Sequence, residues 1–378
     1  MLTREYWRRL MRYPWLKDVL EAEPPFLSIY VDTTRTEPSA AAEIENRWEH
    51  LREKAEAEGA PKSLLQQIER AVLEPAGIGG PHGRAFLAAG GQLFINRVLP
   101  SPPENFVAHN HRPHLLPLMR VAARAVSHLL VQVDRSGADI SLRAPDDPHV
   151  AGSAKALGED ASVEGGHDEL HKTGEGWRGQ NFEARVEDSW ERNAAAVAQR
   201  LDKLVRLYRP DLVLVSGDVR ASHLLKEAVG QECRQRLVEV PGGGRNDGVD
   251  RDEFRVHVEE AVDNFIAFRE KAAVDRFVAE QSRDGDSLAG ADEVRQALQR
   301  GQVDELLVTR GQAPGDIEDL LFQALRTDAA VQSLDSGALS MPDGIGALLR
   351  WRDESTPSNA IPSLSGDRER EASGAARP

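Results

Sequence analysis

The feature that most constrains the fold is one long amphipathic segment, residues 182–209. Its apolar residues recur every three or four positions, which predicts a helix with a single buried face. These residues are Phe182, Val186, Trp190, Ala194, Val197, Leu201, Leu204, Val205 and Tyr208. The helix should end at Arg209, because a residue that precedes proline is disfavoured in the helical conformation. The apolar run 211–218 follows directly and indicates a buried strand, so the helix belongs to a domain built on a sheet.

The segments around this helix predict a mixed α/β domain. Upstream, residues 128–142 indicate two strands joined by a turn at Ser136-Gly137. Downstream, a strand, a helix and a strand follow one another, an order that requires a parallel or mixed sheet. Residues 144–181 are rich in glycine, aspartate and histidine, and we expect them to form a long surface loop. The predicted downstream elements are a helix over 221–233, a strand over 236–240 and a helix over 250–280.

Two smaller α/β units are expected on either side of this domain. In the first, Gly90-Gly91 between two apolar runs predicts the turn of a hairpin. A proline-rich stretch, 100–117, is the expected boundary of that unit. In the last unit, Asp316 should cap a helix and Gly301 should end one. The other predicted elements of the first unit are a strand over 25–32 and a helix over 41–73 that breaks near residues 59–61.

The expected architecture is therefore an α/β chain of three domains. Its length of 378 residues agrees, since single cores rarely grow past about 250–300 residues. The tail is rich in serine, proline, glycine and charge, a composition typical of disorder. The expected divisions are an N-terminal α/β domain over 1–116, a middle domain over 117–285 containing the loop 144–181, a C-terminal domain over 286–352 and a disordered tail over 353–378.

Charge and cysteine content exclude several classes of protein. The chain carries 47 lysines and arginines against 62 aspartates and glutamates, a net charge of −15, so bulk attraction cannot bring it to nucleic acid. Contact with RNA would need a local basic patch, and the N-terminus offers one in Arg4, Arg8, Arg9 and Arg12. The alternative is an ordinary solvated helix face. The single cysteine, Cys233, excludes an internal disulfide and favours the cytoplasm. No apolar run reaches the roughly 18 residues of a membrane span.

Three other motifs are better explained by structure than by chemistry. Gly90-Gly91-Gln92 contains the triplet of peptide release factors, but a hairpin turn explains it. The histidines 109, 111 and 114 have metal-ligand spacing but no carboxylate or cysteine to complete a set. Gly242-Gly243-Gly244-Arg245 follows a strand as phosphate loops do, yet lacks their lysine, so we expect a flexible loop. We predict neither a metal site nor a cofactor.

The segment before the long helix is the strongest candidate for contact with a partner. Glycines surround Trp177, Arg178 and Gln180, so an aromatic ring, a cation and an amide should stand at a flexible tip. These groups are suited to RNA, through stacking and phosphate contacts. The alternative is a glycine-rich lead-in to a helix with no binding role. The candidate RNA-binding residues are Trp177, Arg178, Gly179 and Gln180.

Five segments, in order from about Val131 to Trp351, resemble the middle and C-terminal domains of archaeal and eukaryotic class-I release factors and of their relative Pelota. Each string is weak alone, but five in the right order are specific. The resemblance implies a ribosomal-protein-like α/β middle domain and a C-terminal domain of the L7Ae type. The strings are VDRSGADISL, WRGQNFEARVEDSWERNAAAVAQRLDKL, LVLVSGDVRASHLLKEAV, AGADEVRQALQRGQVDELLV and DGIGALLRW.

The first unit matches no motif of the codon-reading domain of those factors. A release-factor-like middle and C-terminal part joined to a different first unit resembles the bacterial branch of this superfamily, which includes the Balon-type ribosome hibernation factors. The resemblance implies binding to ribosomal RNA in the A site, with elongation factor EF-Tu as a possible companion of the C-terminal half. We expect no membrane and no DNA partner. Where release factors carry Gly-Gly-Gln, this chain has Arg178-Gly179-Gln180. An arginine narrows the backbone freedom that the release loop needs, which favours a non-catalytic role.

Two rival functions remain open on the sequence. One is a peptidyl-tRNA hydrolase that rescues stalled ribosomes, in which Gln180 would be the catalytic residue that orients the water. The other is a protein that binds a small molecule or a stress signal on the same sheet, away from the ribosome. The missing first glycine favours the hibernation role over the hydrolase.

Overall fold

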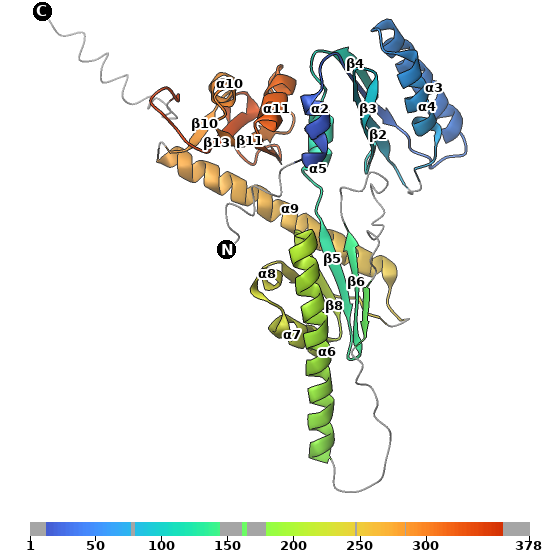
Figure 1. The fold of residues 1–378 in the computed structure, drawn as a ribbon, viewed down its shortest axis with the longest axis vertical. Coiled ribbons are helices and arrows are strands. Elements are labelled where there is room, and N and C mark those ends of the chain that lie inside the picture. Colours follow the sequence, from blue (N-terminus) through green and yellow to red (C-terminus); the bar gives the residue numbers. More distant parts are fainter. Residues whose placement is uncertain are drawn as a thin grey trace, which may run out of the picture. The chain divides into compact units, whose positions relative to one another are not determined.

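The computed structural model describes residues 13–76, 80–143, 161–164, 179–245, 248–283 and 285–357. Within these ranges the chain forms three sheets with helices, the mixed α/β class that the sequence predicts (Figure 1). The described residues fall into two compact units. One unit contains residues 22–268, and the other joins residues 13–21 to residues 269–357.

The N-terminal sheet has four antiparallel strands in the order β3-β2-β1-β4. Two helices pack on one face, where Leu27 and Ile29 share a core with Trp48 and Ile68. On the opposite face the backbone N–H of His114 donates to Ser28 Oγ over 2.9 Å. The elements are β1 (Phe26–Asp32), α3 (Ala40–Ala57), α4 (Lys62–Leu73), β2 (Gly83–Ala89), β3 (Gln92–Leu99), β4 (Phe106–Asn110) and α5 (Leu116–Ala122).

The predicted hairpin is confirmed, and the proline-rich stretch contains a strand that was not predicted. Gly90 and Gly91 have φ values of 56° and 80° between β2 and β3, which explains the Gly-Gly-Gln string as a turn. The proline-rich stretch 100–117 contains β4, which pairs with β1 and lies within the expected N-terminal domain 1–116. Prolines on either side of this short strand conceal it in the sequence, because they suggest a linker.

The middle sheet has five strands in the order β7-β6-β5-β8-β9. β5 pairs in parallel with β8, and β8 with β9, while β6 and β7 are antiparallel, so of the two predicted arrangements, parallel or mixed, the sheet is mixed. The elements are β5 (His128–Val133), β6 (Gly137–Arg143), β7 (Ala161–Glu164), α6 (Gly179–Tyr208), β8 (Leu212–Gly217), α7 (Val219–Ala228), α8 (Gln231–Arg234), β9 (Leu237–Glu239) and α9 (Arg251–Ser282).

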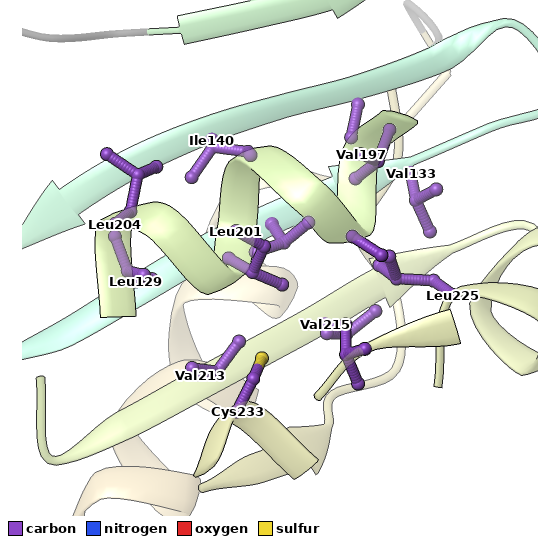
Figure 2. Close-up of a cluster of buried hydrophobic side chains, with 14 of the residues drawn as sticks. Leu129, Val133, Ile140, Val197, Leu201, Leu204, Val213, Val215, Leu225 and Cys233 are labelled. Carbon is purple, nitrogen blue, oxygen red and sulfur yellow. The ribbon is translucent and has the colours of Figure 1, made fainter. Parts of the chain in front are cut away.

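The apolar face of α6 packs on this sheet and forms the core of the middle domain with it, as the helical spacing predicts (Figure 2). Val197, Leu201 and Leu204 of α6 are at most 3% exposed and pack against strand residues such as Val131 and Val213. The helix ends as expected before Pro210, with Arg209 at a φ of 48°. Burying this stripe is the main apolar contribution that α6 makes to the domain.

Two details of the middle domain correct the sequence analysis. The expected loop 144–181 contains the strand β7, which takes up hydrogen-bonding groups at the edge of β6. The single helix expected over 221–233 is divided into α7 and α8. The break lies at Gly230, whose backbone N–H donates to both carboxylate oxygens of Asp202 on α6 over 3.0 and 3.1 Å.

The C-terminal sheet has four strands in the order β10-β13-β11-β12, with β12 at an edge. The second half of α9 supplies Ala273 and Phe277 to its core, beside Leu307 and Leu348. The first half of the same helix supplies Phe265 to a core of the middle domain. The elements are β10 (Ser287–Ala289), α10 (Ala291–Gln299), β11 (Val303–Thr309), α11 (Ile317–Arg326), β12 (Ala330–Leu334) and β13 (Ile345–Leu349).

Helix ends and the tail of this unit differ partly from expectation. Gly301 has a φ of 68° and ends α10, as predicted. Asp316 occupies the N-cap of α11 but makes no cap hydrogen bond, since its carboxylate accepts from Arg295 instead, over 2.6 Å. The tail expected to be disordered from residue 353 is held as far as Thr356, whose hydroxyl accepts from Gln302 Nε2 over 2.8 Å. Residues 358–378 lie outside the described residues.

The first described residues pack with the C-terminal unit. They form the 3-10 helix η1 (Pro14–Leu16) and the helix α2 (Lys17–Glu21), and α2 contacts α11. Leu16 and Val19 are fully buried, and the Tyr13 hydroxyl donates to the carbonyl oxygen of Val331 over 3.2 Å. This segment covers part of β12 at the sheet edge. The sequence placed it with the N-terminal domain, because nothing local identifies the surface that buries it.

Within the described ranges, no helix is long and apolar enough to cross a bilayer.

The cysteine of this fold is predicted to be inert in the native state. Cys233 is fully buried in the core of the middle domain, and burial, with the negative charge of Asp202, raises the pKa of its thiol to about 12 (Figure 2). At pH 8 the thiolate is then about one part in ten thousand of the thiol. We expect iodoacetamide to leave Cys233 unmodified in the native protein and to alkylate it completely in guanidinium chloride, as measured by mass spectrometry. Rapid native alkylation would show that this core opens readily.

Candidate nucleic-acid interface

The predicted RNA-binding residues lie mostly outside the described part of the chain. This is so for Trp177 and Arg178, and for the basic cluster of Arg4, Arg8, Arg9 and Arg12. Gly179 and Gln180 are the first two residues of α6, and only their backbone is described. The candidate tip residues 177 and 178 therefore directly precede the 30-residue helix α6 in the sequence.

Helix α6 runs well past the end of the sheet on which it packs. Asn193 marks the level where the sheet ends, because its Nδ2 donates to the carbonyl oxygen of Arg135 in the β5–β6 turn over 2.9 Å. The part of α6 before Asn193 is about 20 Å long at about 1.5 Å per residue. Figure 1 shows this part extending beyond β5 and β6. The backbone at the start of α6 therefore lies away from the sheet.

The β5–β6 turn at the base of this helix is held by one carboxylate. Asp134 Oδ1 accepts from the backbone N–H groups of Ser136 and Gly137 over 2.8 and 3.0 Å, and from the Ser136 hydroxyl over 2.6 Å. Burial would raise the pKa of Asp134, but the hydrogen bonds from Ser136 and the charge of Arg245 outweigh it and lower that pKa. This carboxylate is committed to the turn.

The glycine-rich loop expected to be flexible is packed against the same end of the sheet. The N–H of Gly243 donates to Ser216 Oγ over 2.9 Å, and Gln132 Nε2 donates to the carbonyl oxygen of Gly244 over 3.0 Å. A Cβ at position 243 would lie 2.4 Å from Phe254 and 2.5 Å from Ser216 Oγ. Glycine is therefore required here by close packing, which corrects the interpretation as a flexible loop.

Arg245 connects this loop to the turn. Its guanidinium donates to Asp134 and Asp139 over 3.1 Å each, and its side chain is 14% exposed. The loop lacks the lysine of phosphate-binding loops. Its arginine, Arg245, neutralises the two carboxylates of Asp134 and Asp139. The loop is thus part of the scaffold of this edge.

A further helix begins at this edge of the sheet. Asp218 caps α7 by accepting from the N–H groups of Arg220 and Ala221 over 2.9 and 3.0 Å. The next side chain, Val219, is 87% exposed, and Arg220 lies with its guanidinium carbon 5.3 Å from the centroid of the Trp190 ring. The helical spacing places Trp190 in the apolar stripe of α6, and no sequence pattern points to Arg220.

Two of the three histidines with metal-ligand spacing contact other groups. The ring of His109 lies 2.9 Å from the carbonyl oxygen of Glu58, and the ring of His114 lies 4.4 Å from that of Phe106. Among the described residues, no group of three or more histidine, cysteine, aspartate or glutamate side chains is arranged to hold a metal ion.

The middle of the chain is similar to a known protein family. Residues 127–283 match the model of bacterial archaeo-eukaryotic release factor family 2. The matched segment runs from the residue before β5 to the residue after α9, so it contains the whole middle sheet, α6 and the edge described above. The match relates this chain to the release-factor-like superfamily. The narrower Balon-type assignment and the L7Ae type of the C-terminal domain stay predictions.

Curated relatives extend over more of the chain. "Uncharacterized protein MT2704" and "Uncharacterized protein Rv2629", from two strains of Mycobacterium tuberculosis, are each 28% identical to it over 379 residues, covering 90% of this chain and 97% of theirs. Their names state no activity.

Solved structures of release factors and Pelota proteins are also similar to this chain. The archaeal translation termination factor aRF1 is 17% identical over 93% of this chain and 99% of its own, with a TM-score of 0.23. Dom34 of S. cerevisiae is 11% identical over 74% and 82%, with a TM-score of 0.41. Pelota of Archaeoglobus fulgidus is 15% identical over 72% and 80%, with a TM-score of 0.34. Values this low support no transfer of residue roles.

Proposed function

We propose that this protein is a ribosome-binding translation factor of the hibernation type, which occupies the A site without catalysing peptide release. The observation that carries the proposal is the match of residues 127–283 to a release-factor family. That segment contains α6 and the residues just before it, the part of the chain that the sequence selects for RNA contact.

The geometry of α6 favours this function over binding of a small molecule on the sheet. A helix that extends about 20 Å beyond its own domain is suited to reach a site inside a large assembly. We propose that Trp177 and Arg178 make stacking and phosphate contacts with ribosomal RNA at that distance. Arg4, Arg8, Arg9 and Arg12 are proposed to contact RNA independently.

The start of α6 also favours a non-catalytic role. Gln180 lies in the first turn of a helix, so its backbone is helical and does not form part of an irregular loop. Release chemistry needs backbone freedom at the triplet, and Arg178 has replaced its first glycine. A companion role for elongation factor EF-Tu at the C-terminal half, and a place in the cytoplasm, belong to the same proposal.

Ribosome binding is tested by sedimentation. We expect the purified protein to pellet with vacant ribosomes at low salt and to dissociate as salt rises, because phosphate contacts release counterions. Trp177→Ala should weaken binding by about 1–3 kcal/mol if its ring stacks on a base. Failure to pellet at any salt concentration would eliminate the proposal.

The hydrolase alternative is separated by a peptide-release assay on ribosomes loaded with peptidyl-tRNA. We expect no release above background from the wild-type protein, and near-normal binding by Gln180→Ala. A clear rate that is lost in Gln180→Ala, with binding retained, would establish the hydrolase instead.

A further inference from the structure

An aromatic ring stands at the base of the projecting part of α6, where the sheet no longer covers the helix. Ala194, Val197 and Leu201 of the buried stripe are at most 6% exposed. Trp190 continues that stripe one turn earlier, past the level of Asn193, and it is only half-buried. The sheet ends at the level of Asn193, and the guanidinium carbon of Arg220 lies 5.3 Å from the centroid of the Trp190 ring.

Two carboxylates at this edge are engaged by groups of the protein itself, and two arginines are exposed. Asp134 and Asp218 accept hydrogen bonds from the protein's own backbone, and Arg245 binds Asp134 as well. Arg135, at the tip of the β5–β6 turn, and Arg220 are both exposed. A surface of this kind can attract an anion locally although the chain carries a net charge of −15.

We propose that Trp190 and Arg220 form a stacking platform for one unpaired nucleotide of ribosomal RNA, with Arg135 contacting a neighbouring phosphate. The proposal rests on the proposed ribosome binding and adds a second contact, at the base of α6. Guanidinium planes and aromatic rings are the groups on which unpaired bases stack, and a guanidinium can lie between a ring and a base. Arg135 is within reach because its carbonyl oxygen is bonded to Asn193, three residues from Trp190.

The test compares variants that separate the planar group from its charge. Arg220→Ala removes both, whereas Arg220→Lys keeps the charge and loses the plane. Trp190→Leu keeps an apolar side chain and loses the ring. The matched control is Arg206→Ala, which removes an exposed arginine near the far end of α6. Folding of each variant is checked by protection of Cys233 from alkylation.

We expect Arg220→Ala, Arg220→Lys and Trp190→Leu each to weaken ribosome binding about tenfold or more, and Arg206→Ala to change it less than twofold. Binding of an unstructured oligoribonucleotide, measured by fluorescence anisotropy, should fall in the same order. Equal affinities of the three platform variants and the control would overturn the platform, and so would wild-type affinity in Arg220→Lys.

The two proposals fail in different ways. If the wild-type protein does not pellet with ribosomes, the proposed function fails and the oligoribonucleotide measurement alone decides on the platform. If the wild-type protein pellets and the platform variants bind as it does, only the platform is lost.

Discussion

Gly217→Ala is expected to destabilise the middle domain by about 3 kcal/mol or more. Gly217 ends β8 at a φ of 131°, a conformation that side chains rarely adopt. An added Cβ would lie 1.9 Å from the carbonyl oxygen of Val133, its partner on β5. Both groups are backbone within one sheet, so neither can move without breaking the pairing of the strands.

Denaturant titration followed by circular dichroism measures this effect, with the alkylation of Cys233 as a second probe of the same domain. Gly248→Ala is the control, because a Cβ there meets nothing within 4 Å. We expect the control to change the free energy of unfolding by about 0.5 kcal/mol at most. A Gly217→Ala protein as stable as the control would show that the end of β8 is not packed as described.

Arg276→Ala is expected to destabilise the C-terminal unit by about 3 kcal/mol at pH 7. Arg276 on α9 pairs with Glu305 on β11 over 2.6 Å, and the Glu305 side chain is 8% exposed. Burial raises the pKa of Glu305, the charge of Arg276 opposes that rise, and the neighbouring Asp304 adds to it. Removing the guanidinium leaves a buried carboxylate that has lost its ion-pair partner.

The pH dependence of the Arg276→Ala destabilisation shows whether the unpaired Glu305 carboxylate causes it. A raised pKa in the folded state means that the folded protein binds a proton more tightly than the unfolded one, so the cost of the bare carboxylate falls as the pH is lowered towards that pKa. The Arg276→Ala penalty should therefore shrink between pH 7 and pH 5. Adding Glu305→Gln to Arg276→Ala should restore much of the stability. A penalty independent of pH, with no rescue by the second change, would show that lost packing is responsible.

The sequence pattern predicted an element correctly where its conformation depends on residues that are close in the chain. The spacing of apolar residues in α6 predicted the helix and its buried face, and Gly90-Gly91 predicted the hairpin, since both depend on backbone conformation and nearest neighbours. The order of strands and helices predicted a parallel or mixed middle sheet. The weak strand β7 was missed because four residues among glycines carry too little pattern.

The candidate site was predicted less completely. The sequence pointed to Trp177 to Gln180, next to the helix that projects from the sheet, but it did not find Arg220. No local signal links Arg220 to Trp190, since 30 residues of helix and strand separate them and only the parallel sheet brings α7 beside α6. The apolar stripe of α6 is longer than the strands on which it packs, which indicates that part of the stripe, including Trp190, lies beyond the sheet.

The sequence by itself determined the long helix and the main strands of the middle domain, that its sheet is parallel or mixed, and that glycine occupies the turn between β2 and β3. Only the tertiary structure decided that residues 13–21 pack with the C-terminal unit, that Gly243 is a close-packed residue, and that Arg245 neutralises Asp134 and Asp139. The physical reason is that helix and turn formation follow from neighbouring residues. Burial and charge pairing depend on groups that are distant in the chain and meet only when the sheets have formed.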